Sequence, residues 1–240
     1  MYTAKMRIIG LRERPWVRKS TQHALGRFCL DEESGIYFEE SMNAEHKALI
    51  CQAFAWVPEP LLENARALGL TMTSCPGLTP AGNSATTYAD FTSRSQSGIS
   101  PHIVMGGPSL EPDFVVPHLV HELCHLYFSN LPSHLRGLWM DLLARQERDG
   151  QGVETGEVTN YAQSFKTSFL SCRLAERASD YCRSEASLKC YAAESFCETV
   201  ACLVCPWYLD KTCSVDLAER RLVIAQMGLA LAPARAKLVA

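Results

Sequence analysis

The residues best suited to chemistry are two histidines and a glutamate in the pentapeptide His121-Glu122-Leu123-Cys124-His125. Residues four apart on an α-helix lie one above the other, so both imidazoles would project from the same face. Two neutral imidazoles about one turn apart can bind one Zn²⁺ at roughly 2.0–2.1 Å each. Glu122, beside the first histidine, could then accept a proton from a metal-bound water. The pattern therefore predicts a zinc site with Glu122 as the general base.

The motif lies in an apolar stretch, residues 114–128, that predicts a buried helix. Polar side chains without partners are costly in such a helix, which favours metal binding over a histidine cluster that only forms hydrogen bonds. Pro117 is tolerated near the start of a helix, where its missing N–H costs least. Asn130 and Pro132 are expected to end the helix.

A catalytic zinc ion usually has three protein ligands and a water, so a third ligand is needed. His118 lies seven residues before His125, about 10 Å along the helix axis, which is too far for both to bind one ion. We expect His118 behind the ligands or at the surface. His134 stays open as a ligand, although it follows the helix-ending Pro132.

Glu194 is the strongest candidate for the third ligand. It stands four residues before Glu198 in a segment that is otherwise apolar or rich in small residues. Two carboxylates on one face of a buried helix repel each other and lose hydration, unless a cation or hydrogen-bond donors compensate. If Glu194 binds the metal, Glu198 could accept the free ring N–H of His121 or His125. The alternative is an exposed acidic helix face.

An HExxH helix followed, after a helical insertion, by a Glu-x-Phe-x-Glu segment resembles the gluzincin peptidases of the anthrax lethal factor-like group, which includes the bacterial Pro-Pro endopeptidases. The resemblance covers residues 60–206, and its matching residues are His121, Glu122, His125, Glu194, Phe196 and Glu198. It implies zinc held by His121, His125 and Glu194, with Glu122 as general base. It also implies a zincin-like domain that hydrolyses peptide bonds of a protein substrate bound in extended form.

The chain departs from that group at three positions. Cys124 and Cys197 stand where the group often has Gly and Ala, and both are small enough to preserve the packing. Ser187 stands where the group places a tyrosine that stabilises the oxyanion. Tyr191 and Tyr181 are left open for that role.

The elements that must position these residues indicate an α+β fold, with a small mixed sheet followed by a mostly helical half that carries the active-site helices. Strands are expected at 6–9, 36–38, 70–73, 86–91 and 99–105, and helices at 45–55, 60–68, 114–128, 135–146, within 165–182, 192–204 and 217–231. We expect the last of these strands, just before the HExxH helix, to pair with an extended substrate. Residues 1–57 are assigned to an α/β extension and 58–240 to the catalytic domain, with one continuous domain as the alternative.

Composition narrows the choice of partners and compartment. The net charge of −3 gives no reason to expect nucleic-acid binding, despite a locally basic stretch in the first twenty residues. No signal peptide is visible, and the apolar stretch 222–232 is too short to cross a bilayer. We therefore expect no membrane partner and a cytoplasmic protein with reduced cysteines, or one delivered into another cell by a specialised secretion system.

Two other classes of protein stay open. The His-Glu-Leu-Cys-His motif followed by Tyr127 is also similar to Spartan/SprT-like proteases that act on DNA-bound proteins, with His134 as the third ligand. A non-catalytic metal-binding interaction protein would instead bind a metal through cysteine thiolates. Its candidate ligands are Cys197, Cys202, Cys205 and Cys213.

Overall fold

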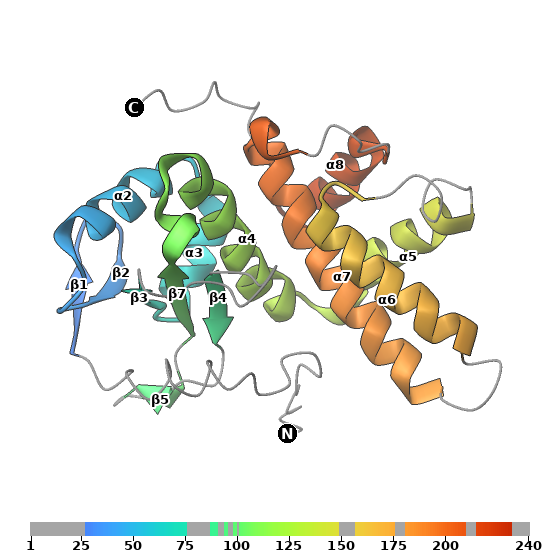
Figure 1. Ribbon diagram of the computed structural model, residues 1–240, viewed down its shortest axis with the longest axis horizontal. Coiled ribbons are helices and arrows are strands. Elements are labelled where there is room, and N and C mark those ends of the chain that lie inside the picture. The colour runs from blue at the N-terminus through green and yellow to red at the C-terminus, as the bar shows by residue number, and fades with distance from the viewer. Residues whose placement is uncertain are drawn as a thin grey trace.

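The computed structural model describes residues 27–75, 87–90, 94–95, 98–99, 101–148, 157–175, 181–209 and 215–231. As predicted, the fold is α+β: a mixed sheet with two helices lies on one side of the long helix Pro112–Asn130, and a mostly helical half lies on the other (Figure 1). The strand expected at residues 6–9 falls outside the described residues.

The main sheet has five strands in the order β1-β2-β3-β7-β4. They are β1 (Phe28–Asp31), β2 (Ile36–Glu39), β3 (Thr71–Cys75), β7 (His102–Gly106) and β4 (Thr87–Asp90). Strands β2, β3 and β7 run parallel, whereas β1 and β4 pair antiparallel at the two ends of the sheet. Two short strands, β5 (Arg94–Ser95) and β6 (Gly98–Ile99), form a separate pair.

Strand β7 lies inside the sheet, which corrects one prediction from the sequence. Ile103 stands opposite Met72 of β3 on one side and opposite Ala89 of β4 on the other. Both hydrogen-bonding edges of β7 are therefore used by neighbouring strands, and the strand cannot accept an extended substrate. Among the described strands, its neighbour β4 is the outermost one on that side.

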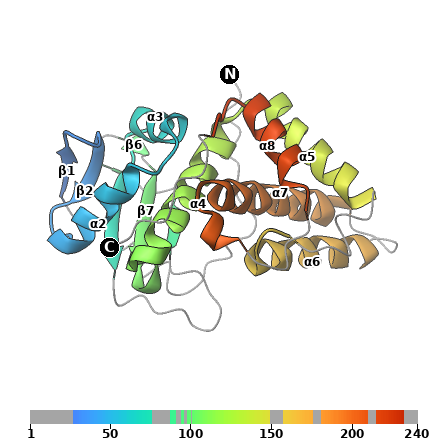
Figure 2. The ribbon, with the colours of Figure 1, turned by 90° about the horizontal axis from the view of Figure 1, so that it is seen from above.

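The helices are α2 (Ala44–Phe54), α3 (Glu59–Ala67), α4 (Pro112–Asn130), α5 (Ser133–Arg148), α6 (Asn160–Ala175), α7 (Tyr181–Val204) and α8 (Leu217–Gln226), with 3-10 turns η1 (Gly107–Leu110) and η3 (Pro206–Tyr208). Helix α4 contacts both α2 and α3, and the three helices share one hydrophobic core with the sheet. Helix α7 lies between α6 on one side and the pair α5 and α8 on the other (Figure 2). None of the helices in the described ranges is long and apolar enough to cross a membrane.

Local chemistry explains where several helices begin and end. The side chains of Asn43 and Asp216 accept hydrogen bonds from backbone N–H groups in the first turns of α2 and α8. Helix α8 ends at Gln226 rather than near residue 231, because Gly228 adopts a left-handed conformation with φ 91°. The bounds of two other helices also differ from the prediction. The helix expected within 165–182 is α6, which begins earlier, at Asn160, and ends at Ala175. Helix α7 begins at Tyr181, whereas the sequence predicted a start near residue 192.

One hydrophobic core joins the half that contains the sheet to the helical half. Its largest members include Phe38 and Met72 from the sheet, Leu119 from α4, and Trp139 and Phe196 from the helical half. Burying such a side chain contributes about 1.5–3 kcal/mol each. The described part of residues 1–57 shares this sheet and core with the rest of the chain.

Candidate metal centre

Helix α4 carries the HExxH residues through the middle of the molecule despite a proline in its first half. Pro117 has no N–H to donate to the carbonyl of Asp113, four residues earlier. The indole Nε1 of Trp207 donates a hydrogen bond to that carbonyl instead, at 3.3 Å. A side chain from η3 thus supplies the donor that the proline removes, and α4 continues to Asn130.

Helix α7 packs along α4 through small and aromatic side chains. Cys124 on α4 and Cys197 on α7 are both fully buried. Phe196 lies 5.0 Å from Phe128 and 5.4 Å from Trp139, measured between ring centroids. Because Phe196 holds α7 against α4 and α5, the glutamates on either side of it are brought to the histidines of α4.

His121, His125 and Glu194 converge on one point. The Nε2 atoms of the two histidines lie 3.0 Å apart. Glu194 Oε2 lies 3.3 Å from His121 Nε2 and 3.4 Å from His125 Nε2. Ligands held at roughly 2.0–2.1 Å around a tetrahedral ion are separated by about 3.3–3.4 Å. Within the described residues, this is the single group of three or more His, Cys, Asp or Glu side chains close enough to hold a metal ion.

The carboxylate of Glu194 is suited to bind a cation. Its Oε2 atom is buried and receives no hydrogen bond from the described residues. Burial raises the pKa of this carboxyl, but the imidazoles of His125 and His121 outweigh burial and hold the pKa well below its ordinary range. A buried ionised oxygen is costly unless a cation or hydrogen-bond donors compensate, so the three side chains fit a bound metal ion.

Glu198 faces the other ring nitrogen of His121. Glu198 Oε1 lies 2.8 Å from His121 Nδ1, although the alignment falls short of a hydrogen bond. Burial lowers the pKa of His121, but the Glu198 and Glu194 carboxylates outweigh it and raise the pKa well above the usual value. Glu198 is only 2% exposed, so this is not the exposed acidic helix face considered as an alternative.

The sequence also singled out Glu122 and His118 on α4 and His134 on α5. Of these, only Glu122 is adjacent to a predicted metal ligand in the chain. Glu122 is 6% exposed and lies on α4 next to His121. His118 stacks on Phe114 at 5.8 Å between ring centroids, and burial together with the nearby His121 lowers its pKa to about 4. Neither His118 nor the exposed His134 belongs to the convergent group.

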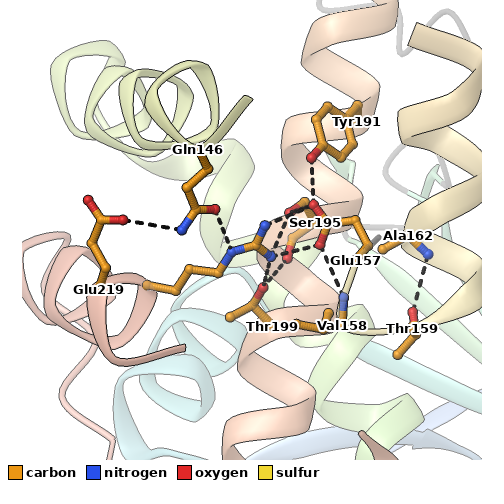
Figure 3. Close-up of polar contacts among 10 residues, drawn as sticks. Gln146, Glu157, Val158, Thr159, Ala162, Tyr191, Ser195, Thr199 and Glu219 are labelled. Atoms are coloured by element: carbon orange, nitrogen blue, oxygen red, sulfur yellow. Dashed lines mark hydrogen bonds and ion pairs between the residues drawn. The ribbon is translucent and has the colours of Figure 1, made fainter. Parts of the chain in front are cut away.

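The tyrosines near the site differ from those considered in the sequence. The Tyr191 hydroxyl donates a hydrogen bond to Glu157 in a separate buried network, and the side chain of Tyr181 lies outside the described residues (Figure 3). The ring of Tyr161, at the start of α6, lies 6.0 Å from that of His121 and is 36% exposed. Tyr161 could not be identified from the sequence, because no motif links α6 to the HExxH helix.

The cysteines of the alternative metal site are buried among apolar residues. Cys197, Cys202 and Cys205 are each at most 3% exposed, and Cys213 lies outside the described residues. Burial raises the pKa of Cys205 to about 12, which disfavours the thiolate that a metal would need. Among the residues with described side chains, these thiols do not form a ligand cluster.

No protein-family model, curated protein or solved structure matches this chain. The fold and the site define a class of centre. Buried His121 and the partly buried His125 and Glu194 form a group able to hold a metal ion, between two packed helices of an α+β protein.

Proposed function

We propose that this chain is a zinc-dependent endopeptidase with a zincin-like fold, of the gluzincin type. The observation that carries the proposal is the convergence of His121 Nε2, His125 Nε2 and Glu194 Oε2 at tetrahedral spacing. Two imidazoles and one carboxylate form a common ligand set of catalytic zinc, which leaves a fourth position for water. The HExxH sequence adds a carboxylate beside the first ligand.

Each side chain has a distinct role in the proposed reaction. When bound, zinc supplies a water whose pKa is lowered to about 7 and polarises the peptide carbonyl. Glu122 accepts the proton from the attacking water and passes it to the leaving amine. Glu198 holds the imidazole of His121 with its Nε2 lone pair directed at the ligand group.

The surroundings of the site support an extended peptide as the substrate. Strand β4 is the outermost described strand on the side of the sheet next to α4. Its outer edge pairs with no other described strand, so it could pair with a peptide backbone. Tyr161 lies beside His121 and is partly exposed, so its hydroxyl is a candidate donor to the carbonyl oxygen as negative charge develops.

The test compares the wild-type protein with Glu122→Gln on a library of proteome-derived peptides, with new termini mapped by mass spectrometry. We expect cleavage by the zinc-loaded wild type alone, and equal zinc content in both proteins. Equal cleavage by both would remove Glu122 from its role. Full zinc occupancy without any cleavage would instead support a non-catalytic metal-binding protein.

A further inference from the structure

A second buried polar cluster lies away from the metal ligands and takes no part in the proposed reaction. Its centre is an ion pair between Glu157, just before α6, and Arg220 of α8, which are 3% and 1% exposed. Arg220 Nη1 donates to Glu157 Oε2 at 2.7 Å, and Nη2 donates to Oε1 at 2.8 Å. This two-fold contact fixes the orientation of both groups.

Helix α7 is attached to this ion pair by three hydroxyl groups. Tyr191 and Ser195 donate to Glu157 Oε1, and Thr199 accepts a hydrogen bond from Arg220 Nη1 at 2.8 Å (Figure 3). The three residues are four apart, so they form one ridge along the helix. Arg220 is also attached to α5, because its Nε donates a hydrogen bond to the side-chain oxygen of Gln146 at 3.1 Å.

The hydroxyl ridge and the metal-site ridge belong to the same helix turns. Glu194 precedes Ser195 and Glu198 precedes Thr199, so the two ridges are about 100° apart around α7. Side-chain tips lie about 5–6 Å from the helix axis, so a rotation of 10° would move them by about 1 Å. Ligand groups must be held within about 0.5 Å to work. The rotation of α7 therefore decides whether Glu194 and Glu198 meet the histidines.

Stability alone does not account for this ion pair. Replacing a buried ion pair with apolar side chains of similar size is often neutral or stabilising, because both charges lose their hydration on burial. Apolar packing would not fix the rotation of a helix, because dispersion contacts depend little on orientation and tolerate small rotations. The bonds between the ion pair and α7 do have direction.

We propose that the Glu157–Arg220 ion pair is a positioning device that sets the rotation of α7 through Tyr191, Ser195 and Thr199, and so places Glu194 and Glu198 at the metal site. The inference rests on the proposed zinc site. Glu157 also accepts a hydrogen bond from the backbone N–H of Val158, and α6 begins two residues later at Asn160. Tyr161 follows in the first turn of α6.

The test removes the α7 attachments and leaves the ion pair in place. The variant Tyr191→Phe/Ser195→Ala/Thr199→Val is compared with the matched control Gln146→Met, which removes the attachment to α5. Zinc dissociation constants are measured by competition with a chelator, the Co²⁺ absorption spectrum reports ligand geometry, and thermal midpoints are recorded without metal. We expect the triple variant to bind zinc about 10-fold or more weakly, with an altered Co²⁺ spectrum, as for other residues that orient metal ligands.

The control Gln146→Met should keep wild-type zinc affinity, even if its thermal midpoint falls as far as that of the triple variant. Wild-type affinity in the triple variant would overturn the inference, and so would equal weakening in both variants, since that indicates a general structural role. If the triple variant does not fold, Tyr191→Phe alone gives the same comparison with one oxygen removed. A wild-type protein that binds no zinc would overturn the proposed function, whereas wild-type binding with unaffected variants overturns this inference alone.

Discussion

Glu198 Oε1 lies 2.8 Å from Nδ1 of His121, while Nε2 of the same ring faces Glu194 and His125. The two sides of one imidazole thus have different partners. A carboxylate at Nδ1 favours the tautomer whose proton is on Nδ1, which leaves the Nε2 lone pair for a metal ion. In the proposed centre, helix α7 therefore provides both a metal ligand and the residue that orients a second ligand.

This relationship predicts graded effects of two substitutions on α7. Glu198→Gln should weaken zinc binding by about 10–100-fold, because the amide is a weaker partner for Nδ1. Glu194→Ala should weaken it further, because a ligand is lost. Chelator competition measures both, with the exposed Glu63 on α3 as a matched control through Glu63→Gln. Wild-type affinity in Glu198→Gln would contradict the orienting role of Glu198.

His118 provides a test on the same helix as the ligands. It is one turn before His121 but stacks on Phe114 and lies outside the convergent group. We expect His118→Asn to keep zinc at full stoichiometry, whereas His121→Asn should lose it. Metal analysis after dialysis measures the difference. Loss of zinc in both variants would show that His118 belongs to the site.

Tyr161 is expected to act through its hydroxyl. Tyr161→Phe should lower kcat by about 100-fold, the size of effect seen when one oxyanion donor is removed, while zinc occupancy stays constant. Tyr161→Ala should lower it at least as much. If the ring serves only to contact substrate, Tyr161→Phe will keep the wild-type kcat and only Tyr161→Ala will raise KM.

The Glu157–Arg220 ion pair predicts a pH-dependent stability. Burial raises the pKa of Glu157, but Arg220 outweighs it, and the net pKa lies below the ordinary value of 4.5. The stabilisation is therefore present above about pH 4.5 and is lost as the pH falls through the lowered pKa. Glu157→Gln should cost about 3–5 kcal/mol at pH 7, because Arg220 is left buried without a counter-charge.

Urea unfolding of the wild type and Glu157→Gln at pH 7, 5 and 3.5 measures this effect. The difference in the free energy of unfolding should be constant between pH 7 and 5 and should narrow at pH 3.5. A difference that does not change with pH would show that Glu157 is not the titrating partner of Arg220.

The convergence of His121, His125 and Glu194 could be predicted because the relevant physics is local. The spacing of His121 and His125 places both on one helix face, and two glutamates on an apolar helix indicate a buried cation site. The structure brings these residues together even though α7 begins earlier than expected. The position of β7 inside the sheet could not be predicted, because strand order depends on pairing between distant segments.

The positioning network could not be predicted for a similar reason. Arg220 and Arg221 are neighbours on α8, yet only Arg220 is buried. Glu157 lies at the end of a Gly-rich segment and has no helix periodicity to show its burial. Which charge is buried depends on how α5, α7 and α8 pack, and that is a property of the tertiary structure.

The most direct test of the zinc site is a crystal structure of the zinc-loaded protein with anomalous scattering at the zinc edge. We expect one ion per chain, bound to His121 Nε2 and His125 Nε2 at roughly 2.0–2.1 Å and to Glu194 at roughly 2.0–2.2 Å, with water as the fourth ligand. An ion held by cysteines, or one with His134 in place of Glu194, would contradict this expectation.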